Sequence, residues 1–338
     1  MPVQYTGIID EHRAVRSACG VFDISHMGQL LVRGNDAASW LDELLTGRLS
    51  ALEPGNSLYT LMLNEGGGVI DDLIAYRLAP DEFLLVVNAS MTSEDLAWMR
   101  ARLKGDLEID DRSDAYAAIA VQGRTAPNVA ASMLGALGVE LPPHNTVHRK
   151  QTEDCEIFLC GTGYTGEAGF ELLCPASAGI GWFRAAIDAG ALPCGLGARD
   201  SLRLEMGYPL NGSDLSPSRS PLEAGLGFFV DLDKPEFVGR DALLAQKRDG
   251  LELRLRGIEM LEKGPPPRPG YSVLVAGEPV GALTSGGLSP SLGKGIGMAY
   301  LPVSSSKIDT PVELDIRGRR FAARVCKKPF YRPEPDPK

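Results

Sequence analysis

Residues 58–90 read LYTLMLNEGGGVIDDLIAYRLAPDEFLLVVNAS, three apolar stretches separated by NEGGG and APDE. Each separator is a turn signal between strands, so the segment predicts three antiparallel strands. Residues 93–105 follow as a predicted helix, with Leu96, Met99 and Leu103 in register on one face. Hairpins beside a helix favour an α+β layer rather than a doubly wound sheet.

The flanking segments continue this mixture of strands and helices. Before residue 58 we expect a helix at 8–18, a strand at 21–34 and a helix at 37–45 that Asn35 and Asp36 cap. The elements expected further along are a strand at 114–123, a loop or domain boundary at 141–150, strands on both sides of a loop at 163–169, a helix at 177–190 and a short helix in 195–207 that Gly207 closes.

The character of the sequence changes from about residue 251. Short alternating segments spaced by Gly and Pro, at 251–260, 271–286 and 311–326, are typical of a small β barrel or sandwich. Residues 232–250 connect this region to the preceding one. The polar tail at 332–338, RPEPDPK, is expected to fray.

Length and charge restrict the class of protein. A chain of 338 residues predicts two or three domains. The excess of 44 acidic over 34 basic residues gives a net charge of -10, which argues against a nucleic-acid partner. No apolar run approaches the roughly 20 residues that span a bilayer. We therefore expect a cytoplasmic protein, or a processed mitochondrial matrix protein if it is eukaryotic.

Neither the cysteines nor the histidines predict a metal site. The six cysteines form no CxxC pair, so we expect buried free thiols rather than disulfides or metal ligands. His144 and His148 have a zinc-like spacing, but they follow Pro142 and Pro143, where we expect a loop. The chain also lacks the G-x-S-x-G, Walker, HExxH and dinucleotide motifs, which weakens hydrolase and nucleotide-binding interpretations.

The loop GYTGEAGFE at 163–171 contains three glycines and two glutamates. A phosphate cradle is excluded, because Glu167 and Glu171 would repel the anion. In the strand that follows the loop, Phe170 and Leu172 point to one face and Glu171 to the other. A carboxylate there can accept two parallel N–H bonds from a planar ring, as a pterin or guanine edge offers, or it can be a solvated or paired strand glutamate. For Glu167 we expect a solvated or structural role.

Arg199 precedes Asp200 near the start of a short predicted helix. A cation is unfavourably placed there against the helix dipole, so the arginine requires an anion. The partner is either a nearby acid, Asp200 or Glu205, or a carboxylate or carbonyl of a ligand. The residues alone leave both open.

Asp95 lies in NASMTSEDLAWM, three residues after Thr92. The pair resembles a capping box, although Glu or Gln is the usual third residue. An acid in the first helical turn is held anionic by the dipole, so Asp95 would serve as a proton acceptor or electrostatic anchor and be a poor general acid. The pattern therefore fits both a helix-capping role and a functional role for Asp95.

Seven segments resemble, in order, the aminomethyltransferase (T-protein) family of the glycine cleavage system, and the likeness covers nearly the whole chain. Each motif alone is weak, but seven in the family's order are specific. The segments are GVFDISHMGQLLVRG, LYTLMLNEGGGVIDDLIAYRL, VVNASMTSEDLAWM, GYTGEAGFELL, GLGARDSLRLEMGYPLNG, PLEAGLGFFVDLDKPEFVGRDALLAQK and SGGLSPSLGKGIGMAYLP.

The resemblance implies a fold: a cloverleaf of three domains around a central folate cavity, with two α+β layers and a C-terminal small β barrel. The implied division is a discontinuous folate-binding α+β domain at 1–50 and 138–230, a ferredoxin-like domain at 51–137, a linker at 231–249, the barrel at 250–332 and a tail at 333–338. It also implies a reaction, in which an aminomethyl group on the lipoyl arm of the H-protein passes to tetrahydrofolate. The products are methylenetetrahydrofolate, ammonia and the reduced lipoyl arm.

The resemblance assigns roles to four residues. Asp95 matches the family's catalytic aspartate, which holds the reactive pterin nitrogen, and Glu171 matches the glutamate that binds the pterin ring. Arg199 matches an arginine that contacts the folate, and Tyr331 matches an aromatic residue that helps enclose it. Phe228 stands where relatives often have Trp, so stacking on the ligand is expected to persist with less area.

Two departures from the family bear on activity. Relatives usually carry a segment before the point where this chain begins, so we expect the family's first helix and part of the folate wall to be absent. Position 94 is Glu where many relatives have Lys, which makes the site more acidic and raises the expected proton affinity of Asp95.

Two other functions share this fold. Folate-dependent demethylases of methylated amines or sulfoniums are the nearer alternative, and a non-enzymatic folate-binding iron-sulfur assembly factor is the more distant one, since its K-G-C-Y-x-G-Q-E motif is missing. The H-protein is the expected partner. A basic cluster that could attract an acidic carrier, or be solvated strand charge, comprises Arg317, Arg319, Arg320, Arg324, Lys327 and Lys328.

Overall fold

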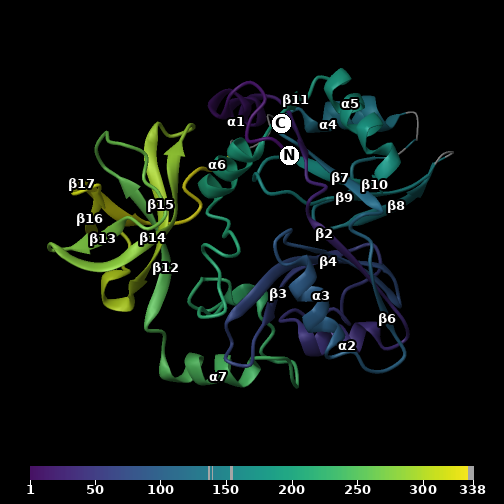
Figure 1. Cartoon of the computed structure of the whole chain (residues 1–338), viewed down its shortest axis with the longest axis horizontal. Helices are drawn as coiled ribbons and strands as arrows, with labels where there is room; N and C mark the ends of the chain where they lie inside the picture. Colours follow the sequence, from purple (N-terminus) through teal and green to yellow (C-terminus); the bar gives the residue numbers. More distant parts are fainter. Residues whose placement is uncertain (136–137, 139, 153–154, 334–338) are drawn as a thin grey trace.

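The computed structural model describes residues 1–135, 138, 140–152 and 155–333. Two β-sheets and a closed barrel make up the architecture, with the barrel at the left of Figure 1 and the two sheets one above the other at the right. The predicted class, mixed α+β with a C-terminal β barrel, is confirmed. The end of the predicted tail lies outside the described residues.

The five-stranded sheet has the order β3-β4-β5-β2-β6. Its strands are β2 (Gly28–Arg33), β3 (Ser57–Leu63), β4 (Val69–Ala79), β5 (Glu82–Val87) and β6 (Glu108–Asp111). The antiparallel ladder β3-β4-β5 confirms the three strands predicted in 58–90. Helices α2 (Ala37–Leu44) and α3 (Thr92–Arg100) cover one face, where Trp40 and Met99 pack with Leu73 and Ala75 of β4.

The six-stranded sheet has the order β11-β1-β7-β10-β9-β8. Helices α4 (Ala126–Leu134) and α5 (Gly179–Asp188), the latter preceded by η2 (Ala176–Ala178), flank it, and Val129 and Ala186 pack with Phe170 and Leu172 of β10. The strands are β1 (Gly20–Asp23), β7 (Tyr116–Gln122), β8 (Val147–Gln151), β9 (Glu156–Cys160), β10 (Gly169–Pro175) and β11 (Leu192–Pro193).

The two sheets share a core. Side chains alternate between the faces of a strand, so Ile74 and Tyr76 of β4 point away from Leu73 and Ala75. They pack instead with a cluster from the six-stranded sheet that includes Leu173. Helices α1 (Ile8–Ser17) and α6 (Leu196–Met206) contact each other beside this shared core. As predicted, Gly207 closes α6 with φ 67, a left-handed conformation that glycine adopts without strain.

The barrel closes in the order β12-β15-β14-β13-β16-β17. Helix α7 (Arg240–Asp249) leads into it from the sheets, and η3 (Gly227–Phe229) and η4 (Val303–Ser305) are short turns of helix. Ile258, Leu283, Ala299 and Val325 are among its core residues. Its strands are β12 (Leu253–Met260), β13 (Ser272–Val275), β14 (Glu278–Ser289), β15 (Lys294–Pro302), β16 (Pro311–Ile316) and β17 (Arg319–Cys326).

The structure corrects two predicted elements. Residues 21–34 form two strands in different sheets, because a turn in which the Met27 amide donates to the Ile24 carbonyl (3.0 Å) redirects the chain. The predicted loop at 141–150 ends in an edge strand, β8, which pairs with β9.

Sheet membership also differs from the predicted division of the domains. Strand β2 lies in the five-stranded sheet and β7 in the six-stranded one. The predicted division placed β2 in the folate-binding domain and β7 in the ferredoxin-like domain. The chain therefore passes between the sheets at residues 24–27 and 112–115 rather than at 50 and 137.

Two further predictions concern caps and thiols. Asp36 precedes α2, but its carboxylate accepts from the Asp106 amide (2.8 Å) rather than from the helix, so the predicted side-chain cap is wrong. All six cysteines are free, as predicted, and four of them are buried. Within the described ranges, no helix has the length and apolar character to cross a membrane.

Candidate functional site

Glu171 of β10 points into the region between the two sheets. Its neighbours Phe170 and Leu172 lie in the core on the other face, as predicted. Only 8% of Glu171 is exposed, and its Oε2 accepts the Thr162 hydroxyl at 2.5 Å. Thr162 also contacts the Tyr76 hydroxyl at 2.7 Å. Among the described residues nothing donates to Oε1 of Glu171, which leaves one carboxylate oxygen for a ligand donor.

Arg199 lies in the first turn of α6 with its guanidinium carbon 4.8 Å from the centre of the Tyr164 ring. Burial lowers the pKa of Arg199, and the charge of Glu171 opposes that effect. Within the described part of the chain the guanidinium makes no hydrogen bond or ion pair. The two acids proposed as partners are used elsewhere: Asp200 pairs with Arg203 (2.7 Å) and Glu205 with Arg16 (2.9 Å). The ligand alternative for Arg199 therefore remains.

Tyr164 is a site residue that the sequence interpretation missed. Its hydroxyl donates to the Pro209 carbonyl, and its ring stacks on Tyr208 with centroids 5.7 Å apart. Burial raises the pKa of Tyr164, so the phenol stays protonated. The signal was present, because Tyr164 is the one aromatic residue in the glycine-rich GYTGE segment. This ring forms the surface beneath Arg199.

Asp72 is a second missed residue. Alternation along β4 places it on the face of Ile74 and Tyr76, toward the six-stranded sheet and Glu171. Its Oδ2 accepts the Tyr59 hydroxyl at 2.9 Å, and its Oδ1 accepts the Asn88 amide at 3.0 Å. Burial, followed by the adjacent Asp71 carboxyl, raises the pKa of Asp72 to about 7. A carboxyl with this pKa can take up or release a proton near neutrality.

Asp95 lies in the first turn of α3, whose Leu96 and Met99 pack on the helix-covered face of the five-stranded sheet. Its side chain is fully buried, and neither carboxyl oxygen has a hydrogen-bond partner among the described residues. Burial, then Asp71 and to a smaller extent Glu94, raise the pKa of Asp95 to about 9. The effect expected of Glu94 is thus confirmed in direction. The expectation of an anionic Asp95 is wrong, because desolvation outweighs the helix dipole.

The predicted capping box at Thr92 is also wrong. The Thr92 hydroxyl donates backward to the carbonyls of Asn88 and Ala89, and Met91 occupies the cap position without a side-chain bond. The structure therefore brings Glu171 and Arg199 together with Tyr164 and Asp72. Asp95, in α3, lies near Asp71, and both Asp71 and Asp72 help to raise its pKa.

Tyr331 lies beside α1 rather than against Glu171 or Arg199. The Arg16 guanidinium carbon is 4.2 Å from the centre of its ring, and its amide donates to the Glu205 carbonyl (3.1 Å). Its role in enclosing the folate stays a prediction. Glu167 accepts from Arg16 Nη1 at 2.7 Å in a buried ion pair, which makes it structural, one of the two roles expected for it.

Phe228 is 93% exposed. It touches Phe229 edge-on (5.4 Å between centroids), and Phe229 touches Tyr59 in the same way (4.7 Å). Because Tyr59 donates to Asp72, this row of rings leads from the surface to the half-buried Asp72 carboxyl. Stacking of Phe228 on a ligand stays a prediction.

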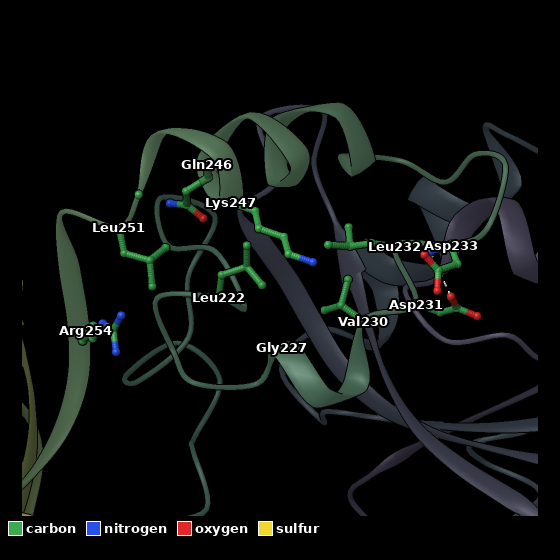
Figure 2. A pocket seen from close by; sticks show the side chains of 11 residues that line it. Leu222, Gly227, Val230, Asp231, Leu232, Asp233, Gln246, Lys247, Leu251 and Arg254 are labelled. Atoms are coloured by element: carbon green, nitrogen blue, oxygen red, sulfur yellow. Dashed lines mark hydrogen bonds between the residues drawn. The ribbon is translucent and has the colours of Figure 1, made fainter.

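A hollow of about 520 Å³ lies beside η3, between the end of α7 and the start of β12, and Figure 2 shows its lining side chains. Lys247 and Arg254 contribute cations, and Leu222, Val230 and Leu251 contribute apolar surface. None of the predicted site residues lines it. The hollow is therefore separate from the Glu171 and Arg199 site.

The predicted basic cluster is partly neutralised. Arg324 pairs with Glu259 (2.5 Å), and Arg320 pairs with Glu313 (3.5 Å). Burial lowers the pKa of Lys328 to about 8. Paired strand charge, part of the second interpretation of this cluster, thus accounts for Arg320 and Arg324, whereas Lys328 lies after β17 and is partly desolvated.

The chain matches known proteins along nearly its whole length. Residues 1–234 match the family described as the GCVT N-terminal domain, and residues 254–332 match the glycine cleavage T-protein C-terminal barrel domain. An aminomethyltransferase of Geobacillus thermodenitrificans is 44% identical over 98% of this chain and 92% of that protein. One of Bacillus subtilis is 42% identical over 98% and 93%.

A solved structure supports the same relationship. The glycine cleavage system aminomethyltransferase T of Bartonella henselae superposes with a TM-score of 0.91 at 32% identity. The match covers 98% of this chain and 92% of that one.

Proposed function

The chain belongs to the glycine cleavage T-protein family of aminomethyltransferases, and we propose that it moves the aminomethyl carbon from a lipoylated carrier, the H-protein, to tetrahydrofolate. The products are methylenetetrahydrofolate, ammonia and the reduced lipoyl arm. Family membership supports the aminomethyltransferase activity itself, while the acceptor and the carrier are our proposal.

The donors and acceptors at the site fit a folate. A pterin ring carries adjacent N–H donors on one edge, and the unpartnered Oε1 of Glu171 can accept from such an edge. Arg199, whose N–H groups bond to none of the residues that the structure describes, can donate to a carbonyl or carboxylate of the same ligand. The single observation that carries the proposal is that one half-buried site holds a Glu171 oxygen and an Arg199 guanidinium to which no described residue is bonded.

We propose that Asp72 handles the proton at this site. Its pKa of about 7 lets it hold or release a proton near neutrality, and Tyr59 and Asn88 fix its carboxyl. Bound tetrahydrofolate supplies the amine nitrogen that accepts the carbon. Asp72 would hold the proton on that nitrogen or accept it. The protein around the site would exclude water.

The catalytic role that the resemblance gives to Asp95 is the competing proposal. It requires the Asp95 carboxyl to reach the ligand from the helix-covered face, where it contacts the buried Asp71. The arrangement supports Asp72 more strongly, because Asp72 shares a sheet face with Tyr76, which is joined to Glu171 through Thr162. Substitution of each aspartate separates the two proposals.

The proposed function is tested by comparing methyl and aminomethyl donors with the purified protein. We expect tetrahydrofolate and aminomethyl-lipoyl H-protein to give methylenetetrahydrofolate. We expect no turnover of dimethylglycine, sarcosine or dimethylsulfoniopropionate. Turnover of one of these donors, with none from the H-protein, would replace the proposal by a demethylase function.

A further inference from the structure

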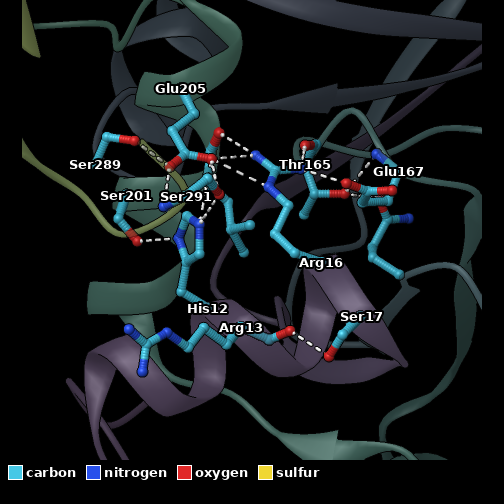
Figure 3. A network of polar contacts seen from close by, with 12 residues as sticks. His12, Arg13, Arg16, Ser17, Thr165, Glu167, Ser201, Glu205, Ser289 and Ser291 are labelled. Atoms are coloured by element: carbon cyan, nitrogen blue, oxygen red, sulfur yellow. Dashed lines mark hydrogen bonds and ion pairs between the residues drawn. The ribbon is translucent and has the colours of Figure 1, made fainter. Parts of the chain in front are cut away.

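Arg16 of α1 is the buried centre of a polar network that joins four parts of the chain (Figure 3). Its Nη1 donates to the Thr165 carbonyl at 2.8 Å and to Glu167 Oε1 at 2.7 Å. Its Nε and Nη2 donate to Glu205 Oε2 at 3.1 and 2.9 Å. The side chains of Arg16, Glu167 and Glu205 are 7%, 4% and 0% exposed. All three nitrogens of one guanidinium are thus engaged away from solvent.

Glu205 extends the network from α6 to the barrel. Its Oε1 accepts from the Ser289 hydroxyl and from the Ser291 amide (3.0 Å), and its Oε2 also accepts the Ser291 hydroxyl (2.9 Å). Burial alone would raise the pKa of Glu205, but His12, Ser289 and Arg16 lower it to about 2. Glu205 therefore stays anionic and holds α1, α6 and the barrel together.

Both halves of the proposed ligand site are attached to this network. The loop at 161–168 that Arg16 holds through Thr165 and Glu167 carries Tyr164 and leads into Glu171. Helix α6, held through Glu205, carries Arg199. The loop fits tightly on the helix, because a side chain at Gly166 (φ 79) would meet Met206 at 2.4 Å. A shift at Arg16 would thus change the spacing between Glu171 and Arg199.

We propose that Arg16 is a positioning residue, which sets the distance between the Glu171 strand and the Arg199 helix without touching the ligand. This inference rests on the proposed function only where it predicts that Arg16 affects the binding of folate. The planar fork of arginine suits this position, since it donates in two directions at once, whereas a lysine ammonium acts as a point charge. The restraint itself is a property of the free protein.

Two measurements on Arg16→Met test the proposal. In hydrogen exchange of the ligand-free protein we expect faster exchange in residues 161–168 and 196–206, with the barrel strands unchanged. In steady-state kinetics we expect the KM for tetrahydrofolate to rise about tenfold while kcat changes much less, since a misplaced binding group weakens uniform binding. Arg16→Lys should recover part of the KM.

Matched variants keep the test decisive. Arg33→Met removes an arginine from an ion pair with Glu82 (2.9 Å) outside this network, and should leave both measurements unchanged. If Arg16→Met does not fold, Glu167→Gln serves in its place and should show the same loop effect to a smaller degree. Unchanged exchange at 161–168 in a folded variant overturns the inference, as does a kcat loss without a KM rise. If the wild type does not use tetrahydrofolate, the proposed function is overturned. The hydrogen-exchange result still decides whether Arg16 is a positioning residue.

Discussion

The guanidinium carbon of Arg199 lies 4.8 Å from the centre of the Tyr164 ring, and among the described residues that guanidinium pairs with no acid. A cation stacked on an aromatic ring with its N–H groups unengaged is arranged to receive an anion or a carbonyl. Asp200 and Glu205, the acids close to it along the chain, pair instead with Arg203 and Arg16. Arg199 is therefore available to a ligand at the junction of α6 and the 161–168 loop.

Arg199→Met should weaken tetrahydrofolate binding by tenfold to about a hundredfold, since a hydrogen bond to a charged group contributes about 1.5–3 kcal/mol. Calorimetric titration of the folate measures the change, and Arg33→Met is the matched control. Full affinity in Arg199→Met would remove Arg199 from the binding site.

Glu171→Gln should also weaken folate binding, by about tenfold, because one acceptor oxygen becomes an N–H donor facing ligand donors. The Thr162 hydroxyl can still donate to the remaining oxygen, so we expect the fold to be kept. The affinity for tetrahydrofolate and the melting temperature are measured together. An affinity equal to that of the wild type would show that Glu171 is only a strand residue.

Asp72→Asn should reduce turnover by at least about a hundredfold while folate still binds, because the exchangeable proton is lost but the shape is kept. In the wild type, a limb of the rate profile should fall near pH 7, where Asp72 titrates, and Asp72→Asn should lack it. Asp95→Asn should keep most of the turnover. The reverse result, with activity lost in Asp95→Asn and kept in Asp72→Asn, would restore the catalytic role first assigned to Asp95.

Asp95 should make the protein less stable as the pH rises. Its pKa is about 9 in the folded chain and near 4 in the unfolded chain, so the native state binds the extra proton between these values. The stability is fully present below about pH 4 and is lost as the pH rises towards 9. Asp95→Asn should therefore flatten this dependence by up to about 1.4 kcal/mol per pH unit.

Denaturant unfolding at several pH values between about 5 and 8 measures this slope. Asp36→Asn is the control, since that acid is at the surface and accepts from the Asp106 amide. An unchanged slope in Asp95→Asn would mean that Asp95 is ionised in the folded protein.

Strand alternation predicted the direction of Glu171 correctly, because that pattern depends only on local geometry. The partners of Arg199 could not be read from the sequence. Asp200 and Glu205 are both close along the chain, and only the packing of α1 and the barrel on α6 assigns them to other arginines.

The misreading of Asp95 has a similar cause. Its helical position indicated an anion, but the desolvation that reverses this comes from the sheet beneath it. The adjacent pair Asp71 and Asp72 carried a usable signal, since alternation places one carboxyl on each face of β4. The sequence could not show which face of β4 meets the six-stranded sheet.

The most direct test follows an isotopic label from donor to acceptor. H-protein carrying a labelled aminomethyl carbon on its lipoyl arm is mixed with tetrahydrofolate and the purified protein, and the label is located by NMR. We predict that it appears in methylenetetrahydrofolate with release of one ammonia per carbon, and that Arg199→Met requires more folate for the same rate. A label that stays on the H-protein, although tetrahydrofolate is bound, would contradict the proposed transfer.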